Sequence, residues 1–431
     1  MTPKLKVTRR NFIGASSAAA IGAPALLQGT PSDKIRIAGI GMGGKGRGDL
    51  RAVLSAPNVE CVAVCDVYTE HLAQAAQDSK NPRVKQTMEY REILDDPSID
   101  AIIAAPPDHW HSRICIDAVS AGKDIYLEKP FTLTMNEARE TVDAVNASGQ
   151  VFQFGHQRRS EPRWYKAREI VKSGKLGSVH NVHAFWYLST LHSAGGWPGD
   201  LRQYTPPKAC TADNIDWKRW LGTAPQRAFD PVRFRRWRFF KDYSTGLCGD
   251  LQSHLVDAAN IVLQFGIPDT CIAQGQFARV HDGRDWPGEW NSIYNFEKLG
   301  ISLHGSVSVN NGQRGVGVII YGTEAAMEIN DGTIRVYPEA TTDGYAALGG
   351  TKTMKGSERN RDLFEEYGPE TWPEMEDNKL NFISCVRSRK VANADINSAW
   401  EEMATNTMSV ESWRNQRAYK YVPGRRDVAP V

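Results

Sequence analysis

The stretch from residue 33 to residue 54, DKIRIAGIGMGGKGRGDLRAVL, decides the fold that we expect. An apolar run typical of a buried strand passes directly into a cluster of glycines and then into a helical pattern. Gly41, Gly43, Gly44 and Gly46 would let the turn approach a pyrophosphate closely, and the N-terminus of the following helix would bind its charge. A register shifted two residues toward the N-terminus matches as well. Both registers predict a dinucleotide-binding strand–turn–helix unit.

A carboxylate stands where such a unit binds the ribose of the dinucleotide. The apolar run VECVAVCD (59–66) ends in Asp66, roughly 20 residues beyond the glycine cluster. A carboxylate there accepts a hydrogen bond from a free 2′-hydroxyl and repels a 2′-phosphate, so the sequence favours NAD. Lys45 and Arg47 lie beside the turn, and NADP therefore stays as the less favoured alternative.

Alternation of strands and helices continues along the first half of the chain. Residues 99–122 and 123–149 each combine an apolar run, a turn and a helical pattern, and Thr134 is placed to cap the second helix. Regular units of this length predict an α/β fold with a parallel, doubly wound sheet. We expect this nucleotide-binding Rossmann domain over residues 34–157 and a substrate and oligomerisation domain over residues 158–431.

Ligands of such sheets bind at the carboxyl ends of the strands, which directs attention to three turns. The candidates for cofactor contact there are Pro106, His111, Glu128 and Lys129. The candidates for substrate contact are His156 and Arg158. We expect Asp108 to cap the helix after the first turn.

The second half is rich in predicted strands, with aromatic side chains in the loops between them. Trp197, Trp237 and Tyr243 lie in such loops and could stack against a sugar ring. Packing of these rings at a domain or subunit interface is the alternative interpretation.

Four motifs of this sequence together resemble the glucose–fructose oxidoreductase, inositol dehydrogenase and MocA (Gfo/Idh/MocA) family. They are GMGGKG (41–46), PPDHWH (106–111), YLEKPFTLT (126–134) and GDLQSHLVD (249–257). The resemblance implies a Rossmann domain followed by an α/β domain with a large open, mainly antiparallel sheet. It also implies homo-oligomers, either dimers or tetramers, and hydride exchange between a nicotinamide and a sugar or polyol.

The resemblance assigns catalytic positions to Lys129, Asp250 and His254, and the residue types suit that chemistry. Asp250 and His254 are four residues apart in a predicted helix that ends at Gly266, so they can share one face. Histidine titrates near neutral pH and can accept the proton of an alcohol, while Asp250 orients the ring and the Lys129 ammonium binds the substrate oxygen. A surface pair Asp250–His254 without a catalytic role is the alternative.

Several other functions are disfavoured by the sequence. The full chain has a formal net charge of +2, and removal of the four leader cations leaves about −2, which gives no basic face for nucleic acid. His180 and His183 lie in a predicted strand where positions three apart face opposite sides, so we expect no metal site. The seven cysteines show no C-x-x-C spacing, and we expect no disulfide framework.

The beginning of the chain, VTRRNFIGASSAAAIGAPALL (7–27), has the pattern of a removable export signal. Arg9 and Arg10 indicate the twin-arginine route, so we expect residues 1–30 to form the signal and a linker. The export machinery is then a partner, and the folded protein is expected in the periplasm. A cytoplasmic protein with an alanine-rich leader is the alternative, and the apolar run is short for a membrane anchor.

Export of an already folded protein suggests that NAD is loaded in the cytoplasm, held tightly and regenerated within each cycle. The expected activity is oxidation of a sugar, polyol or glycoside hydroxyl with this bound cofactor. A second enzymatic interpretation is an NAD-dependent glycosidase that works by transient oxidation, elimination, hydration and re-reduction. An interpretation of another class is a non-catalytic carbohydrate-binding protein with the same fold.

Overall fold

The computed structural model describes residues 34–189, 201–277, 281–330, 332–339 and 364–431. The expected signal, residues 1–30, and the candidate substrate residue Trp197 lie outside these ranges. Residues 35–431 form one compact unit.

The first half folds as a six-stranded parallel sheet in the order β3-β2-β1-β4-β5-β6. This is the doubly wound Rossmann order, and it confirms the fold class expected from the sequence. The strands are β1 (Ile35–Ile40), β2 (Val59–Cys65), β3 (Lys85–Thr87), β4 (Ala101–Ala104), β5 (Asp124–Leu127) and β6 (Phe152–Phe154). The helices between them are α1 (Gly44–Val53), α2 (Thr69–Asp78), α3 (Arg91–Leu94), α4 (His111–Ser120) and α5 (Met135–Ser148).

The caps of α5 follow the sequence closely. The Thr134 side chain accepts from the Glu137 backbone N–H, and the Glu137 carboxylate accepts from the Thr134 backbone N–H, which together make a capping box. Gly149 ends the helix in the left-handed conformation at φ +68°. The prediction that Thr134 begins this helix is confirmed.

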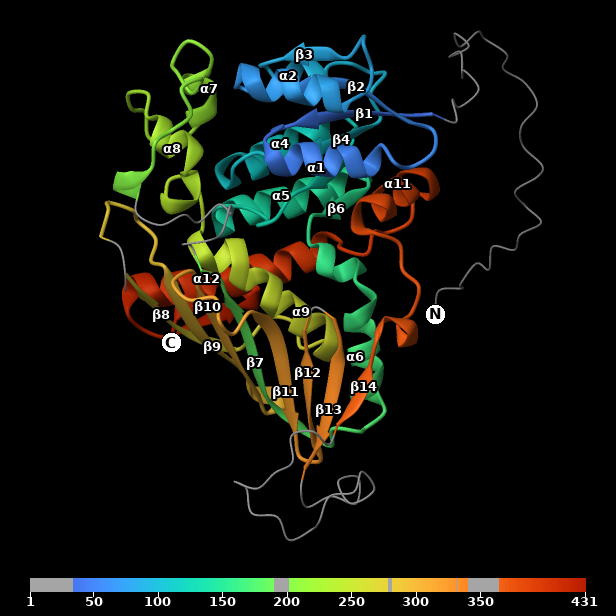
Figure 1. The fold of residues 1–431 in the computed structure, drawn as a ribbon, viewed down its shortest axis with the longest axis vertical. Helices are drawn as coiled ribbons and strands as arrows, with labels where there is room; N and C mark the ends of the chain where they lie inside the picture. Colours follow the sequence, from blue (N-terminus) through green and yellow to red (C-terminus); the bar gives the residue numbers. More distant parts are fainter. Residues whose placement is uncertain (1–33, 190–200, 278–280, 331, 340–363) are drawn as a thin grey trace, which may run out of the picture. The chain divides into compact units, whose positions relative to one another are not determined.

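The second half forms a ten-stranded sheet in the order β14-β13-β12-β11-β7-β10-β9-β8-β15-β16 (Figure 1). Strands β7 and β10 are parallel, and the other neighbours paired by register are antiparallel, as the large open sheet of the expectation requires. The strands are β7 (Val179–Tyr187), β8 (Thr270–Gln276), β9 (Glu289–Phe296), β10 (Ile301–Ser308), β11 (Val316–Gly322), β12 (Ala325–Ile329), β13 (Ile334–Pro338), β14 (Glu365–Tyr367), β15 (Tyr419–Val422) and β16 (Asp427–Pro430).

Helices α6 (Pro162–Lys172), α9 (Ser253–Leu263) and α12 (Ile396–Asn415) lie beside this sheet (Figure 1). Buried residues of α6, α9, α12 and the strands share one hydrophobic core. Ile272 and Ile293 of β8 and β9 are 47% and 41% exposed. The sheet therefore presents apolar side chains away from its core.

The C-terminal part of the chain returns to the Rossmann sheet. Phe382 and Ile383 of α11 (Asn378–Ser388) share a hydrophobic core with Ile37 of β1, and Met403 of α12 shares the core on the other face with Ile102 of β4. A sequence boundary at residue 157 therefore separates the two sheets but not the helices that cover them.

Two further features concern long apolar helices and the cysteines. Among the described residues, no helix combines the length and apolarity needed to cross a bilayer. All seven cysteines are described, and each is buried as a free thiol.

Candidate active site

The glycine turn after β1 is packed so tightly that two of its positions exclude a side chain. Gly41 has φ +75°, and a Cβ there would lie 2.5 Å from the Pro106 nitrogen. A Cβ on Gly46 would lie 2.2 Å from the Gly41 carbonyl oxygen. The turn therefore rests on the end of β4, and Gly46 supports it from within α1.

The other side of this turn, at the N-terminus of α1, is open and lacks a capping side chain. Nothing stands within 4 Å of a Cβ built on Gly44, and the first turn of α1 carries no side-chain cap and no acidic residue. Free backbone N–H groups at such a bare helix N-terminus attract an anion. The residues present thus fit the pyrophosphate of a dinucleotide.

A cleft of about 1170 Å³, its open mouth included, runs from this turn along the ends of β2 and β4. Of the predicted cofactor residues, those that line it are Gly41, Gly43, Gly44, Asp66 and Pro106. The predicted substrate residue Trp237 lines it as well, at the wall formed by the second half of the chain.

Asp66 directly follows β2 and lines the cleft, as the ribose-binding prediction requires. One carboxylate oxygen accepts from the Tyr68 backbone N–H at 2.9 Å, and the other lies 3.2 Å from His71 Nδ1. These contacts fix the carboxylate, and the lone pairs left on each oxygen can still accept from a ribose hydroxyl.

Glu128 lies beneath the cleft and is not part of its lining. Its carboxylate is 2.9 Å from Lys45 Nζ and accepts from the Tyr126 hydroxyl at 3.1 Å. Lys45 also pairs with Asp49 at 2.7 Å, and burial, with the Glu128 charge, raises the pKa of Asp49 to about 7. Glu128 therefore ties α1 to the end of β5.

His111 is likewise buried below the cleft surface. Its Nδ1 lies 2.6 Å from the Pro130 carbonyl oxygen and its Nε2 3.0 Å from the Pro106 carbonyl oxygen. These contacts join the turns after β4 and β5, a position that suits a role in shaping the site.

Asp108 does not cap α4, contrary to the expectation, because a short 3₁₀ turn precedes that helix. The Asp108 carboxylate instead accepts a hydrogen bond from the Thr245 backbone N–H at 3.3 Å.

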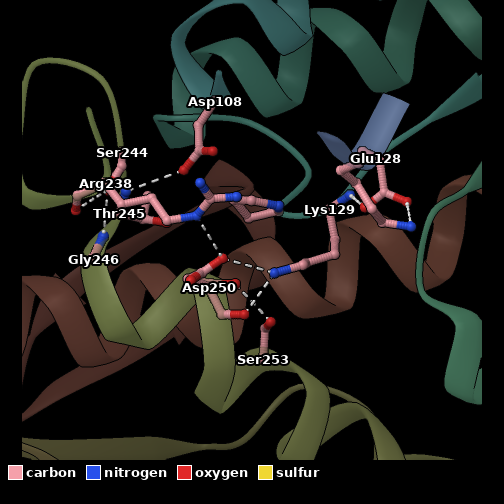
Figure 2. Close-up of polar contacts among 12 residues, drawn as sticks. Asp108, Glu128, Lys129, Arg238, Ser244, Thr245, Gly246, Asp250 and Ser253 are labelled. Carbon is pink, nitrogen blue, oxygen red and sulfur yellow. Dashed lines mark hydrogen bonds and ion pairs between the residues drawn. The ribbon is translucent and has the colours of Figure 1, made fainter. Parts of the chain in front are cut away.

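Lys129 and Asp250 meet across the two halves of the chain (Figure 2). Lys129 Nζ lies 2.9 Å from the Asp250 carboxylate and 2.6 Å from its backbone carbonyl. Arg238 Nε contacts the same carboxylate at 3.3 Å. Arg238 also lines the cleft, so the ion pairs that Asp250 makes with Lys129 and Arg238 adjoin the cleft wall. Burial raises the pKa of the neighbouring Asp108 to about 8, against the opposing charge of Arg238.

The helix expected from residue 250 to residue 266 begins differently. Residues Cys248–Gln252 form a π-helical turn, and α9 follows as a regular helix and ends with Gln264 in the left-handed conformation. A Cβ on Gly249 would lie 1.9 Å from Thr245 Oγ1, which shows how closely this turn packs. Turns of this type are frequent at functional sites, and here it places Asp250 toward Lys129 and Arg238.

His254 is the second residue of α9 and is 4% exposed. Its ring lies 4.9 Å from the His156 ring and 5.6 Å from the Trp186 ring, measured between centroids. Within the described residues its Nδ1 atom is buried without a hydrogen-bond partner. Burial, and then the charge of Lys129, holds the pKa of His254 well below its usual 6.5. The ring is therefore neutral at neutral pH and able to accept a proton.

Sequence reasoning missed a buried charged pair behind this histidine. The Asp257 carboxylate lies 2.9 Å from His156 Nδ1 and 2.6 Å from the Arg159 guanidinium. Burial raises the pKa of Asp257, but the charges of Arg159 and His156 outweigh it and hold the pKa at about 2. His156 is fully buried, so it supports His254 from behind; the spacing of Asp257 from His254 on one helix was the available signal.

Two further predicted substrate residues, Tyr243 and Arg158, are buried. Tyr243 is fully buried among the rings of His109, Trp220 and Phe240, so its prediction as a substrate contact is wrong and the packing alternative holds. Arg158 is also buried, with its guanidinium 5.4 Å from the Trp186 ring that faces His254. Among the described residues, no group of three potential metal ligands of the His, Cys, Asp or Glu type occurs.

The fold and the cleft define a two-domain protein with a Rossmann dinucleotide-binding domain. Residues 35–156 match the family model GFO_IDH_MocA, described as "Oxidoreductase family, NAD-binding Rossmann fold". These residues are thus similar to the NAD-binding Rossmann domain of the Gfo/Idh/MocA oxidoreductases.

Named relatives match less than half of the chain. It is 31% identical to the scyllo-inositol 2-dehydrogenase (NAD(+)) of Bacillus subtilis over 173 residues, 40% of this chain and 48% of that protein. It is 27% identical to the levoglucosan dehydrogenase of Pseudarthrobacter phenanthrenivorans over 200 residues, 44% of this chain and 42% of that protein. The chain thus spans about half the length of these relatives or somewhat less.

Solved structures show likeness over nearly the whole chain. A levoglucosan dehydrogenase in complex with NADH and levoglucosan superimposes with a TM-score of 0.65 at 19% identity, covering 89% of this chain and 98% of that one. An oxidoreductase domain protein from Kribbella flavida gives 0.66 at 17% identity, covering 89% and 98%. At these identities the likeness establishes the fold alone.

Proposed function

We propose that this protein oxidises a hydroxyl group of a sugar, polyol or glycoside with a tightly bound NAD, and that the NADH formed returns to NAD within each catalytic cycle by reducing a second, carbonyl-bearing molecule. The observation that carries the proposal is the ion pair of Lys129 with Asp250, whose carboxylate is also contacted by Arg238 of the cleft wall. His254 lies near enough to this pair for the Lys129 charge to lower its pKa. The dehydrogenases of inositol and levoglucosan among its relatives support an alcohol on a polyhydroxylated ring as the substrate class.

The charges of these residues suit alcohol oxidation. A bound nicotinamide dinucleotide supplies the hydride acceptor and donor. The Lys129 ammonium, held by Asp250, can bind the hydroxyl oxygen and stabilise its developing negative charge. A ring nitrogen of neutral His254 can take the hydroxyl proton and return it in the reverse direction. Burial of His254 keeps bulk water away from this proton transfer.

The test is a product analysis of the protein purified without added cofactor. Bound dinucleotide is first identified by mass and absorbance, and the protein is then mixed with a panel of sugars, polyols and glycosides. We expect an oxidised carbohydrate and the near-ultraviolet absorbance of reduced nicotinamide. Release of an aglycone without net oxidation would replace this proposal with the glycosidase interpretation, and saturable binding without any product would replace it with the carbohydrate-binding one.

We further propose that residues 1–30 direct export of the folded, cofactor-loaded protein to the periplasm by the twin-arginine route. The paired Arg9 and Arg10 ahead of a short apolar run support this. Cell fractionation tests it: the full chain should reach the periplasm with NAD bound, and replacement of both arginines by lysine should hold it in the cytoplasm. Periplasmic delivery of the double variant would contradict the route.

A further inference from the structure

A segment of the second half of the chain crosses the dinucleotide cleft. Residues 214–238, here called the strap, contain α7 (Trp217–Leu221) and α8 (Pro231–Arg235) and lie beside the β2 and β3 side of the Rossmann sheet (Figure 1). No part of the dinucleotide fingerprint lies in the strap, and the family model ends before it, at residue 156.

One end of the strap is hydrogen-bonded to the turn between β2 and α2. The Asn214 carbonyl accepts from the Thr69 N–H at 3.0 Å, and the Asp216 N–H donates to the Val67 carbonyl at 2.8 Å. Ile215 forms an isolated bridge with Tyr68. These contacts follow Asp66 directly, so the strap begins at the ribose end of the cleft.

The strap is also bound to the turn between β4 and α4. The Trp220 carbonyl accepts from Trp110 Nε1 at 2.8 Å and lies 2.9 Å from His109 Nε2. The Phe234 ring packs against the Tyr68 and His71 rings at 5.5 and 6.4 Å. Because both turns line the cleft, the strap forms its outer wall from one turn to the other.

The inner side of the strap brings six side chains to the cleft: Arg219, Trp220, Phe234, Arg235, Trp237 and Arg238. Arg219 is 3.3 Å from the Glu89 carboxylate, and Arg238 is 3.3 Å from that of Asp250. Arg235 is half-buried and, within the described residues, has no hydrogen-bond or ion-pair partner. A half-buried guanidinium without a partner loses hydration and gains no compensating contact.

Other residues that line the same cleft indicate what Arg235 could bind. They include Gly43 and Gly44 at the bare N-terminus of α1, where the phosphates of a dinucleotide fit. A guanidinium binds phosphate oxygens with charge-assisted, often paired hydrogen bonds. An anionic dinucleotide therefore supplies the partner that Arg235 lacks.

We propose that the strap is part of the cofactor site, that Arg235 binds a phosphate of the dinucleotide, and that Phe234 closes the wall beside it. The cofactor then leaves only when the contacts of the strap with the two turns open. This inference rests on the proposed function for the identity of the cofactor, and it explains why NAD would be retained rather than exchanged.

Cofactor exchange tests the inference without any substrate turnover. The purified holoprotein is mixed with excess isotope-labelled NAD, and replacement of the unlabelled NAD is followed by mass spectrometry. We expect Arg235→Ala to exchange about 10- to 100-fold faster than the wild type, because a hydrogen bond to a charged group is lost. Arg235→Lys should lie between them, because it keeps the charge and loses the paired geometry, and Phe234→Ala should also exchange faster.

Lys218→Ala is the matched control, since Lys218 lies on the same strap but is exposed and does not line the cleft. Its exchange rate should equal that of the wild type. Wild-type exchange rates in Arg235→Ala and Phe234→Ala, with bound NAD and a normal circular dichroism spectrum, would overturn the strap proposal and leave the proposed function intact. If these variants exchange NAD faster but the protein oxidises no carbohydrate, the strap proposal stands and the proposed function fails.

Discussion

At the scale of single residues, the account depends on Lys129 and His254. Lys129→Ala should lower kcat about 10²- to 10³-fold, the usual cost of removing one donor to a developing oxyanion. The protein should remain folded, because Arg238 still pairs with Asp250. Steady-state kinetics with the identified substrate measure this, with Lys390→Ala, an exposed lysine far along the chain, as the control. An undiminished kcat would remove Lys129 from the mechanism.

The pH dependence of oxidation reports on His254. The proton acceptor must be neutral, and burial together with the Lys129, His156 and Arg158 charges lowers the pKa of His254 well below 6.5. As pH falls, the ring therefore stays neutral through 6.5, and kcat/KM should decline only in clearly more acidic solution. A pH profile of kcat/KM checks this. An acidic limb centred near 6.5, the value of an unperturbed imidazole, would show that another group accepts the proton or that the ring is hydrated.

Some of these residues could be predicted and others could not. The glycine turn, Asp66 and Lys129 follow strands that local periodicity reveals, so their positions at the strand ends were predictable. The pair His156–Asp257 and the contact of Arg238 with Asp250 were not predicted. His156 and Asp257 lie about a hundred residues apart in the sequence, and no local pattern predicts contacts at that separation. Tyr243 was misjudged because an aromatic side chain in a loop looks the same whether it faces a ligand or a core.

At the scale of elements, α1 offers a matched pair of glycines. Gly46→Ala should displace the turn, because its Cβ would lie 2.2 Å from the Gly41 carbonyl oxygen, and the purified protein should lose most of its NAD. Gly48→Ala lies on the same helix with nothing within 4 Å of its Cβ, so it should keep NAD and gain about 0.5–1 kcal/mol of stability. Cofactor content and chemical unfolding measure both. Equal NAD content in the two variants would contradict the role assigned to the turn.

The Thr134 capping box tests how α5 is held in place. Thr134→Ala removes one half of the reciprocal pair with Glu137 and should cost about 1 kcal/mol in the free energy of unfolding. Chemical denaturation measures this cost, and Thr134→Ser, which keeps the hydroxyl, should restore most of the lost stability.

The start of α9 shows the limit of predicting helices from local spacing. The i,i+4 spacing of Asp250 and His254 predicted a regular helix, but a π-helical turn forms there, with Gly249 packed against Thr245.

At the scale of the whole molecule, the apolar face of the ten-stranded sheet suits association with a second copy. Ile272, Ile293, His183 and Arg314 line a shallow groove on it. We predict a homo-oligomer, a dimer or tetramer, and expect Ile272→Glu and Ile293→Glu to shift its mass in light scattering toward the monomer. Val391→Glu is the control, because Val391 is 79% exposed outside this sheet. A monomeric wild-type protein would contradict the prediction.

In the proposed function, one site couples a bound NAD to a carbohydrate hydroxyl through Lys129 and His254. A single-turnover measurement tests it most directly: the holoprotein and its His254→Ala variant, each with NAD content determined, are mixed rapidly with the substrate. We expect the reduced-nicotinamide absorbance to rise in proportion to bound NAD in the wild type, and to rise about 10²- to 10⁴-fold more slowly in the variant. An equally fast rise in both proteins, or none in an NAD-loaded wild type with any carbohydrate of the panel, would contradict it.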